Sequence, residues 1–100
     1  MGTPFERWVT RNDFEEARLD FIRTDLGGCL TFAKVAETAY SMGHREHAKR
    51  TIASAEKGYS DMLRYFSQAT GMTAEVEREL QSRFKRLRER LDGLQRLMQS

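Results

Sequence analysis

Apolar side chains recur every three or four residues through most of this chain, and this spacing limits the folds that it can adopt. Residues spaced in this way lie on one face of an α-helix. The spacing runs through three segments, residues 13–42, 45–69 and 73–98. Because the connections between them are short, consecutive helices are expected to be antiparallel. The sequence therefore predicts one all-α domain over residues 1–100, an up-down-up three-helix bundle with a short N-terminal lead-in.

Each predicted helix carries an apolar stripe that we expect to form the core, and the single tryptophan, Trp8, is expected to pack on the bundle. The stripes are Leu19, Ile22, Leu26, Cys29, Ala33, Ala36 and Tyr40; then Ala48, Ile52, Ala55, Tyr59, Met62 and Phe66; then Leu80, Phe84, Leu87, Leu91, Leu94 and Met98. A second row beside the first stripe is predicted to widen the core, and it consists of Phe14, Ala17, Phe21, Phe32, Val35 and Ala39. The third stripe is narrow, so its helix should pack against one or two neighbours.

Four glycines fall inside the predicted helices. The first stripe keeps its phase across Gly27 and Gly28, whereas a loop at this point would reset it. We therefore expect one continuous first helix with a weakened middle, and the alternative is a break here that gives four helices. Gly58 and Gly93 are expected to be weak points too, since a glycine in a helix interior costs about 1 kcal/mol.

The ends of the predicted helices carry recognisable signals. Asn12, with Glu15 three residues later, has the spacing of a capping box at the start of the first helix. Gly43 and Gly71 suit the left-handed position that follows many helices. Thr73 is a fair N-cap for the third helix. The sequence therefore places the two turns at Gly43 and Gly71.

Composition excludes several classes of protein. One cysteine among 100 residues cannot form an internal disulfide, so a disulfide-stabilised secreted domain is excluded. No apolar stretch has the length of a signal peptide or of a membrane span. A net charge of +2 is too small to indicate a polyanion partner by itself. We expect a cytoplasmic protein that does not associate with membranes.

Few side chains indicate chemistry. His44 and His47 stand three residues apart, where zinc-binding helices space their histidines by four, and we expect them to be solvated turn residues. Cys29 lies in the core stripe, where its thiol is expected to be inert. The acidic residues of the first helix lack the Glu-x-x-His motif of di-metal bundles, and they are Glu15, Glu16, Asp20 and Asp25. We therefore expect no catalytic residue, no metal, no cofactor and no enzymatic activity.

The third predicted helix contains a dense basic run. Residues 82–90 hold five cations and one acid, Glu89, for a net charge of +4; the cations are Arg83, Lys85, Arg86, Arg88 and Arg90. Arg83, Arg86 and Arg90 share one helical face and could contact phosphates or an acidic protein surface. The more ordinary interpretation is a solvated face, or pairing with the acidic first helix.

Residues 32–55 resemble a single tetratricopeptide-like hairpin. The pattern consists of Phe32, Val35 and Ala36 in the first helix, Gly43 at the turn, and Ala48, Ile52 and Ala55 in the second helix. The pattern is not repeated 34 residues later, so the chain holds one hairpin and no array. In size the layout is similar to the microtubule-interacting-and-trafficking (MIT) domain, a three-helix bundle built on such a hairpin. This resemblance implies a helical module that binds a peptide or a protein.

Two functions follow as expectations. The first is a non-enzymatic helical module for protein–protein interaction, with a protein or peptide partner and with self-association into a homo-oligomer such as a dimer. A slender three-helix bundle has much surface for its core, and self-association buries more of that surface. The alternative is a small nucleic-acid-associated regulator that uses the face formed by Arg83, Arg86 and Arg90.

Overall fold

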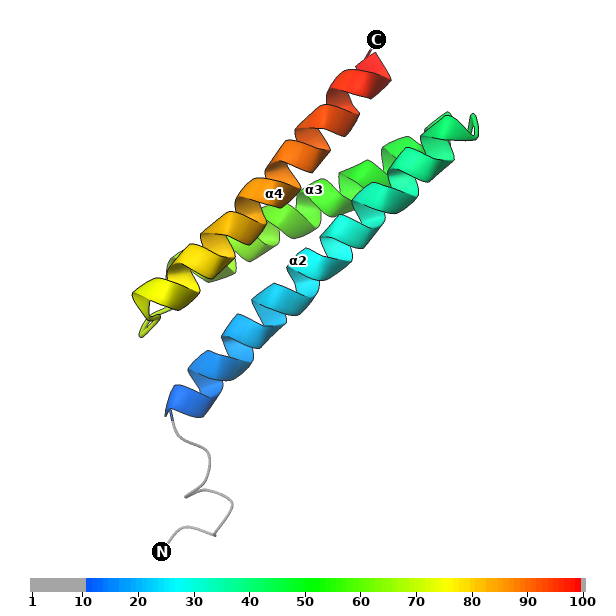
Figure 1. Ribbon diagram of the computed structural model, residues 1–100. Helices are drawn as coiled ribbons and strands as arrows, with labels where there is room; N and C mark the ends of the chain where they lie inside the picture. The colour runs from blue at the N-terminus through cyan, green and yellow to red at the C-terminus, as the bar shows by residue number, and fades with distance from the viewer. Residues whose placement is uncertain (1–10, 100) are drawn as a thin grey trace, which may run out of the picture.

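A computed structural model of the chain describes residues 11–99, with side chains from Glu15 onward. Within this range the chain forms three helices, α2 (Arg11–Ser41), α3 (Arg45–Gln68) and α4 (Ala74–Gln99), joined by two short turns (Figure 1). Every bound lies within two residues of its predicted place. The predicted all-α, up-down-up bundle of three helices is confirmed. The lead-in and Trp8 lie outside the described residues, so the expected packing of Trp8 stays a prediction.

The first helix is continuous, as its unbroken stripe predicts. α2 runs through Gly27 and Gly28 without interruption (Figure 1), so the alternative of a fourth helix is wrong. Both glycines are exposed, and a Cβ atom at either position would contact nothing within 4 Å. α2 also begins at Arg11, which places Asn12 inside the helix rather than at its predicted cap.

The turns form where glycine permits a left-handed backbone. Gly43 and Gly71 have φ angles of 85° and 73°. At the first turn the backbone N–H of His44 donates to the carbonyl of Ala39, 2.8 Å away, which closes the end of α2. At the second, the hydroxyl of Thr73 accepts a hydrogen bond from the backbone N–H of Val76 at 3.2 Å, and the predicted N-cap is confirmed.

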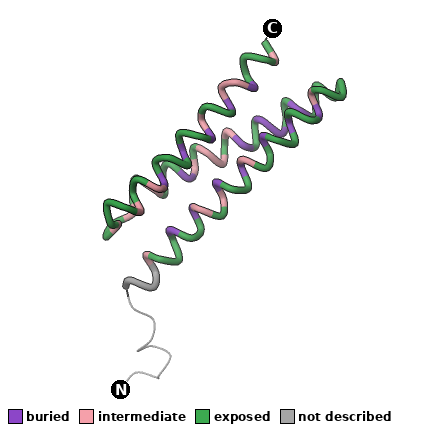
Figure 2. Tube along the Cα trace, in the orientation of Figure 1, coloured by how far each residue is buried: buried purple, intermediate pink, exposed green. Residues whose placement is uncertain are grey.

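The three predicted stripes meet in one core that runs along the bundle (Figure 2). Nearly all of their members are buried, and Tyr40, Tyr59, Phe66 and Met98 are half-buried at its edges. The second row of α2 does not widen this core as predicted. Among its described residues Ala39 alone is buried, and exposed members include Phe21, Phe32 and Val35. The reason is geometric: this row lies on the side of α2 that α4 does not reach.

α4 lies on one side of the hairpin formed by α2 and α3. It runs parallel to α2, because contacts join Arg23 to Glu79 near the start of α4 and the hydroxyl of Tyr40 to the carbonyl of Leu97 near its end. On its other flank, the ring of Phe84 packs against Tyr59 and Phe66 of α3 at centroid distances of 5.7 and 5.3 Å. α2, with 31 residues at 1.5 Å per residue, is about 46 Å long and the other helices lie alongside it, so the bundle is long and thin.

Candidate interaction surface

The predicted arginine face of α4 is partly used within the molecule. Arg90 contacts Glu37 of α2 at 2.9 Å, and Arg83 contacts Glu79 of its own helix at 3.2 Å. Arg86 is exposed, and it has no ion-pair partner among the side chains that the structure describes, those of residues 15–99. The structure thus leaves one of the three arginines unpaired, and the pair with Glu37 fits the expectation that the basic run meets the acidic first helix.

The fourth arginine of the basic run, Arg88, makes an ion pair with α3. Its guanidinium donates to both carboxylate oxygens of Glu56 on α3, lies over the ring of Tyr59 with 4.9 Å to the centroid, and also contacts Asp92. These hydrogen bonds from Arg88 hold the pKa of Glu56 below its usual value. This pair has no local sequence signal, because 32 residues separate its members.

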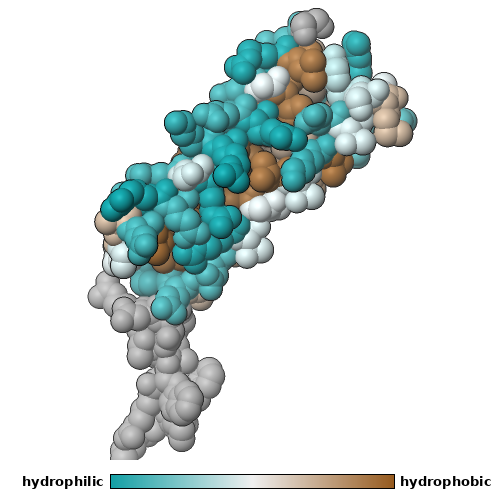
Figure 3. Space-filling model, viewed as in Figure 1, coloured by the Kyte–Doolittle hydropathy of each residue, from teal (hydrophilic) through white to brown (hydrophobic). Residues whose placement is uncertain are grey.

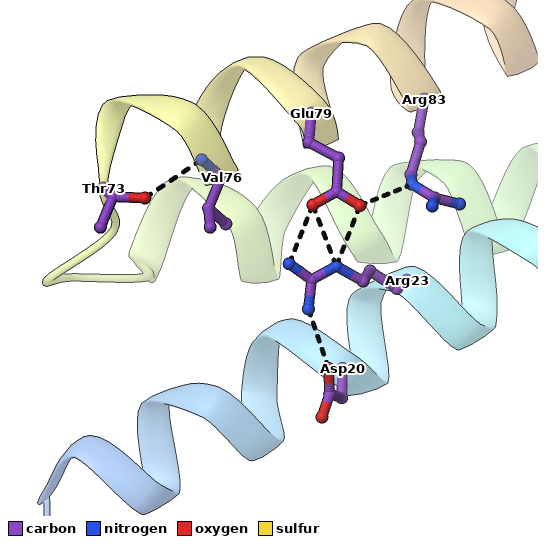
Figure 4. A network of polar contacts seen from close by, with 6 residues as sticks. All are labelled: Asp20, Arg23, Thr73, Val76, Glu79 and Arg83. Atoms are coloured by element: carbon purple, nitrogen blue, oxygen red, sulfur yellow. Dashed lines mark hydrogen bonds and ion pairs between the residues drawn. The ribbon is translucent and has the colours of Figure 1, made fainter.

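The start of α4 is held to α2 by a network centred on Arg23 (Figure 4). The Arg23 guanidinium donates to both oxygens of Glu79, at 2.9 and 3.2 Å, and to Asp20 at 2.8 Å. Glu79 also accepts from Arg83. The hydrogen bonds from Arg23 are the main reason that the pKa of Glu79 is lowered. Together with Glu37 and Arg90, this network fixes the parallel register of α2 and α4.

The nucleophile and metal candidates stand apart from one another. Cys29 is buried, and burial, with the negative charges of Asp25 and Asp61 nearby, raises the pKa of its thiol, which confirms it as a core residue. His44 and His47 are exposed at the start of α3. Over residues 11–99 no three side chains of the metal-ligating types come together in a way that could hold an ion.

The outward side of α2 is unusually poor in charge. Between residues 21 and 42 the helix has four charged side chains, which are Arg23, Asp25, Lys34 and Glu37. Two of these, Arg23 and Glu37, are paired with α4. Apart from Asp25 and Lys34, what remains on the side away from α4 is mostly threonine, glycine and apolar residues, with Phe21 and Phe32 each 48% exposed, Val35 42% and, just after the helix, Met42 66%. In Figure 3 hydrophilic residues gather over α4, whereas paler residues follow α2.

We call this surface the open face, and it spans both helices of the hairpin. From α2 it takes Phe21, Thr24, Gly28, Thr31, Phe32, Val35 and Thr38, together with Met42 just after the helix, and from α3 it takes His47, Arg50, Ser54, Asp61 and Tyr65. The α3 residues recur at helical spacing, which keeps them on one side of that helix. Phe21 and Tyr65 meet edge to face across the hairpin, with ring centroids 5.7 Å apart. Sequence analysis found the α2 row but assigned it to the core.

A groove deepens the open face beside the first turn. It has a volume of about 490 Å³ and is lined by Lys34, Val35 and Met42 of α2 and by His44 and His47 of α3, among others. A smaller hollow continues it toward the middle of the hairpin, between Phe32 and the α3 side chains that include Arg50 and Ser54. The lining combines apolar side chains with threonines, two histidines and one cation, Lys34.

Comparison with known proteins finds no match: neither a family model, nor a curated protein, nor a solved structure is similar to this chain. The resemblance of residues 32–55 to tetratricopeptide and MIT hairpins therefore stays a prediction. No helix among the described residues combines the length and the apolar character needed to cross a bilayer. The functional interpretation rests on the geometry of the open face and of the arginine run.

Proposed function

We propose that this chain is a non-enzymatic helical module that binds protein through its open face and associates with itself. The observation that carries the proposal is the exposure of Phe21, Phe32 and Val35 along one side of α2 and of Met42 just after it. A surface helix normally turns a charged face to water, and a helix without such a face is normally covered. Exposed apolar side chains that gather on one side of a helix are typical of protein-interaction sites.

The arginine run gives less support to nucleic-acid binding. Arg90 and Arg83 already neutralise carboxylates, and Arg88, on another side of α4, is engaged by Glu56. A phosphate contact would have to compete with these pairs. The expected absence of a reaction also has a physical support, since the raised pKa of the buried Cys29 thiol disfavours the nucleophilic thiolate.

Light scattering coupled to size-exclusion chromatography tests the proposal. The full chain at about 100 μM, far above the dissociation constant of an ordinary stable dimer, is expected to show at least twice its chain mass of 11.7 kDa. A monomer at this concentration would contradict self-association.

Binding of a mixed oligonucleotide pool at low salt tests the nucleic-acid alternative. We expect no binding by the wild-type chain. Salt-sensitive binding that is lost in an Arg83→Ala/Arg86→Ala/Arg90→Ala variant would instead favour a nucleic-acid-associated regulator, because counterion release makes phosphate contacts strongly salt-dependent.

A further inference from the structure

A second surface lies on the side of the molecule where α2 and α4 run next to each other. We propose that this surface, the arginine seam, binds an acidic segment of a partner protein. The seam is formed by Gly27, Leu30 and Lys34 of α2 and by Arg83, Arg86 and Arg90 of α4. This inference goes beyond the proposed function, because it depends neither on self-association nor on the exposed apolar side chains of the open face.

Two arginines of the seam have donors that the described chain does not use. Glu79 accepts from both Arg23 and Arg83, and Arg83 reaches it only through Nε. In Figure 4 the two terminal nitrogens of Arg83 point away from Glu79, and they have no partner among the described side chains. Arg86, about one helical turn further along α4, has no ion-pair partner there at all. Two neighbouring guanidinium groups are therefore available to carboxylates from outside.

The acidic side chains around this part of the seam are either paired or turned away. Those in ion pairs are Asp20, Glu37 and Glu79. Glu16 lies about three helical turns from Gly27, toward the start of α2, and Asp25 lies about 160° round α2 from it. Glu89 lies about 60° round α4 from Arg86 and makes no ion pair with it. The middle of the seam thus carries unbalanced positive charge.

A further cation borders this part of the seam. Lys34 follows Gly27 by about two helical turns on the same side of α2. It also lines the groove beside the first turn, so it stands between the seam and the open face. Within the described chain Lys34 has no ion-pair partner. A partner segment that lies along the seam would meet this charge after it passes the two arginines.

Between the arginines and α2 the seam has a small hollow. Its volume is about 40 Å³, and it is lined by Leu26, Gly27, Leu30, Arg83, Arg86 and Leu87. Gly27 leaves this space open, since a Cβ at position 27 would meet nothing within 4 Å. A glycine inside a helix lowers its stability, and no neighbour in the described chain requires one here. Glycine at such a place lets another chain approach closely.

The surroundings of the hollow favour an acidic protein segment over a nucleic acid. Carboxylates form strong paired hydrogen bonds with guanidinium groups, and the leucines of the hollow suit a small apolar side chain between two carboxylates. A nucleic acid would lay a continuous row of phosphates along the seam, where Glu37 and Glu79 interrupt the row of cations. None of the residues that line the hollow is aromatic, so it offers no ring on which a base could stack.

Fluorescence anisotropy of an acidic peptide with the full chain at low salt tests the proposal. The probe is a fluorescein-labelled helical peptide of four Glu-Ala-Leu-Glu repeats. Arg86→Ala should bind it about ten-fold more weakly than the wild type, because a charge-assisted hydrogen bond is lost. Lys85→Ala is the matched control. It removes the same charge at the adjacent position, about 100° round α4, and should bind the peptide as the wild type does.

A second pair of variants tests the hollow without weakening the fold. Gly27→Leu places a side chain in the hollow and should weaken peptide binding about ten-fold, because the peptide can no longer bury an apolar side chain there. Gly28→Leu adds the same side chain about 100° round α2 and should leave binding unchanged. Both substitutions raise helix propensity, and circular dichroism checks that every variant is folded.

The remaining outcomes would overturn the proposal. Equal weakening by Arg86→Ala and Lys85→Ala would show a diffuse attraction to net charge, and equal binding by Gly27→Leu and Gly28→Leu would show that the hollow is not used. A wild-type chain that does not bind the peptide would overturn the proposal outright. Tighter binding of a single-stranded oligonucleotide of equal charge would assign the seam to nucleic acid instead. Self-association is tested separately by light scattering, so its failure and the failure of this proposal are distinguishable.

Discussion

A single glycine sets how closely α2 and α3 approach. A methyl group at position 58 would lie 2.6 Å from the Sγ of Cys29, closer than any packed side chain tolerates. Gly58 was interpreted from the sequence as a weak point of its helix, because glycine lowers helix propensity. The structure gives it a packing role, since it leaves room for the Cys29 thiol, and the exposed glycines of α2 have no comparable neighbour.

Gly58→Ala is expected to lower the free energy of unfolding by about 1–3 kcal/mol, the usual cost of overpacking, in spite of the better helix propensity of alanine. Gly27→Ala is the matched control and should raise it by about 0.5–1 kcal/mol, since its Cβ meets nothing. Urea denaturation of both variants at one protein concentration provides the measurement. In a Cys29→Ala background, Gly58→Ala should lower the free energy of unfolding by less than it does in the wild type. Equal stabilisation by Gly58→Ala and Gly27→Ala would refute the packing role of Gly58.

The Glu56–Arg88 pair makes stability depend on pH. The pKa of Glu56 is lower in the folded chain than its ordinary value of 4.5, so the carboxylate stabilises the fold above that value. This contribution is lost as the pH falls from 4.5 through the lowered pKa, because the unfolded chain then binds the proton more readily. Glu56→Gln should lower the free energy of unfolding by about 1 kcal/mol at neutral pH. It should also make the loss of stability at acid pH less steep.

Glu46→Gln is the control for this pair. Glu46 meets Lys49 at 3.7 Å with 82% of its side chain exposed, so its removal should leave the profile unchanged. Thermal unfolding between pH 3 and pH 7 measures both variants. If Glu56→Gln and Glu46→Gln have the same pH dependence of stability, the Glu56–Arg88 pair does not make the predicted contribution.

At the scale of the helices, hydrophobic periodicity was a sufficient guide to length and continuity. The stripe of α2 keeps its phase across Gly27 and Gly28, and the helix runs through them. Periodicity identifies a buried face, but it does not say which helix covers that face. This is why Phe21, Phe32 and Val35 were assigned to the core, although α3 and α4 leave them half-exposed.

The candidate surface was accordingly harder to predict than the fold. Of the arginines singled out on α4, Arg83 and Arg90 are in ion pairs, whereas the pair of Arg88 with Glu56 depends on the register of two helices that are far apart in sequence. The open face likewise follows from the side of the hairpin on which α4 packs. Neither feature has a local sequence signal.

Leu87→Ala tests whether the apolar stripe of α4 is packed in the core. Leu87 is 1% exposed at the middle of the α4 stripe, so the substitution should cost about 2–5 kcal/mol through lost burial and a residual cavity. Leu97→Ala, on the same helix but 45% exposed, should cost less than about 1 kcal/mol. A cost below about 0.5 kcal/mol for Leu87→Ala would show that this stripe faces solvent.

The whole molecule is a thin bundle with two unlike sides. α4 covers one side of the hairpin and has 12 charged residues among its 26, whereas the other side presents Phe21, Phe32, Val35 and Met42 to water. A protein partner on this side would cover the second half of α2, where residues 26–41 hold only two charged side chains, Lys34 and Glu37. The central claim is therefore that the open face is a protein-binding surface.

The most direct measurement is light scattering of the Phe32→Glu/Val35→Glu variant over a concentration series up to about 100 μM. Its matched control is Leu63→Glu, which places a charge at a 39% exposed residue on the opposite side of α3 from Tyr65. We predict that the wild type and Leu63→Glu have at least twice the chain mass at the highest concentration, and that the double variant stays folded at 11.7 kDa. Equal masses for the three proteins would contradict the claim.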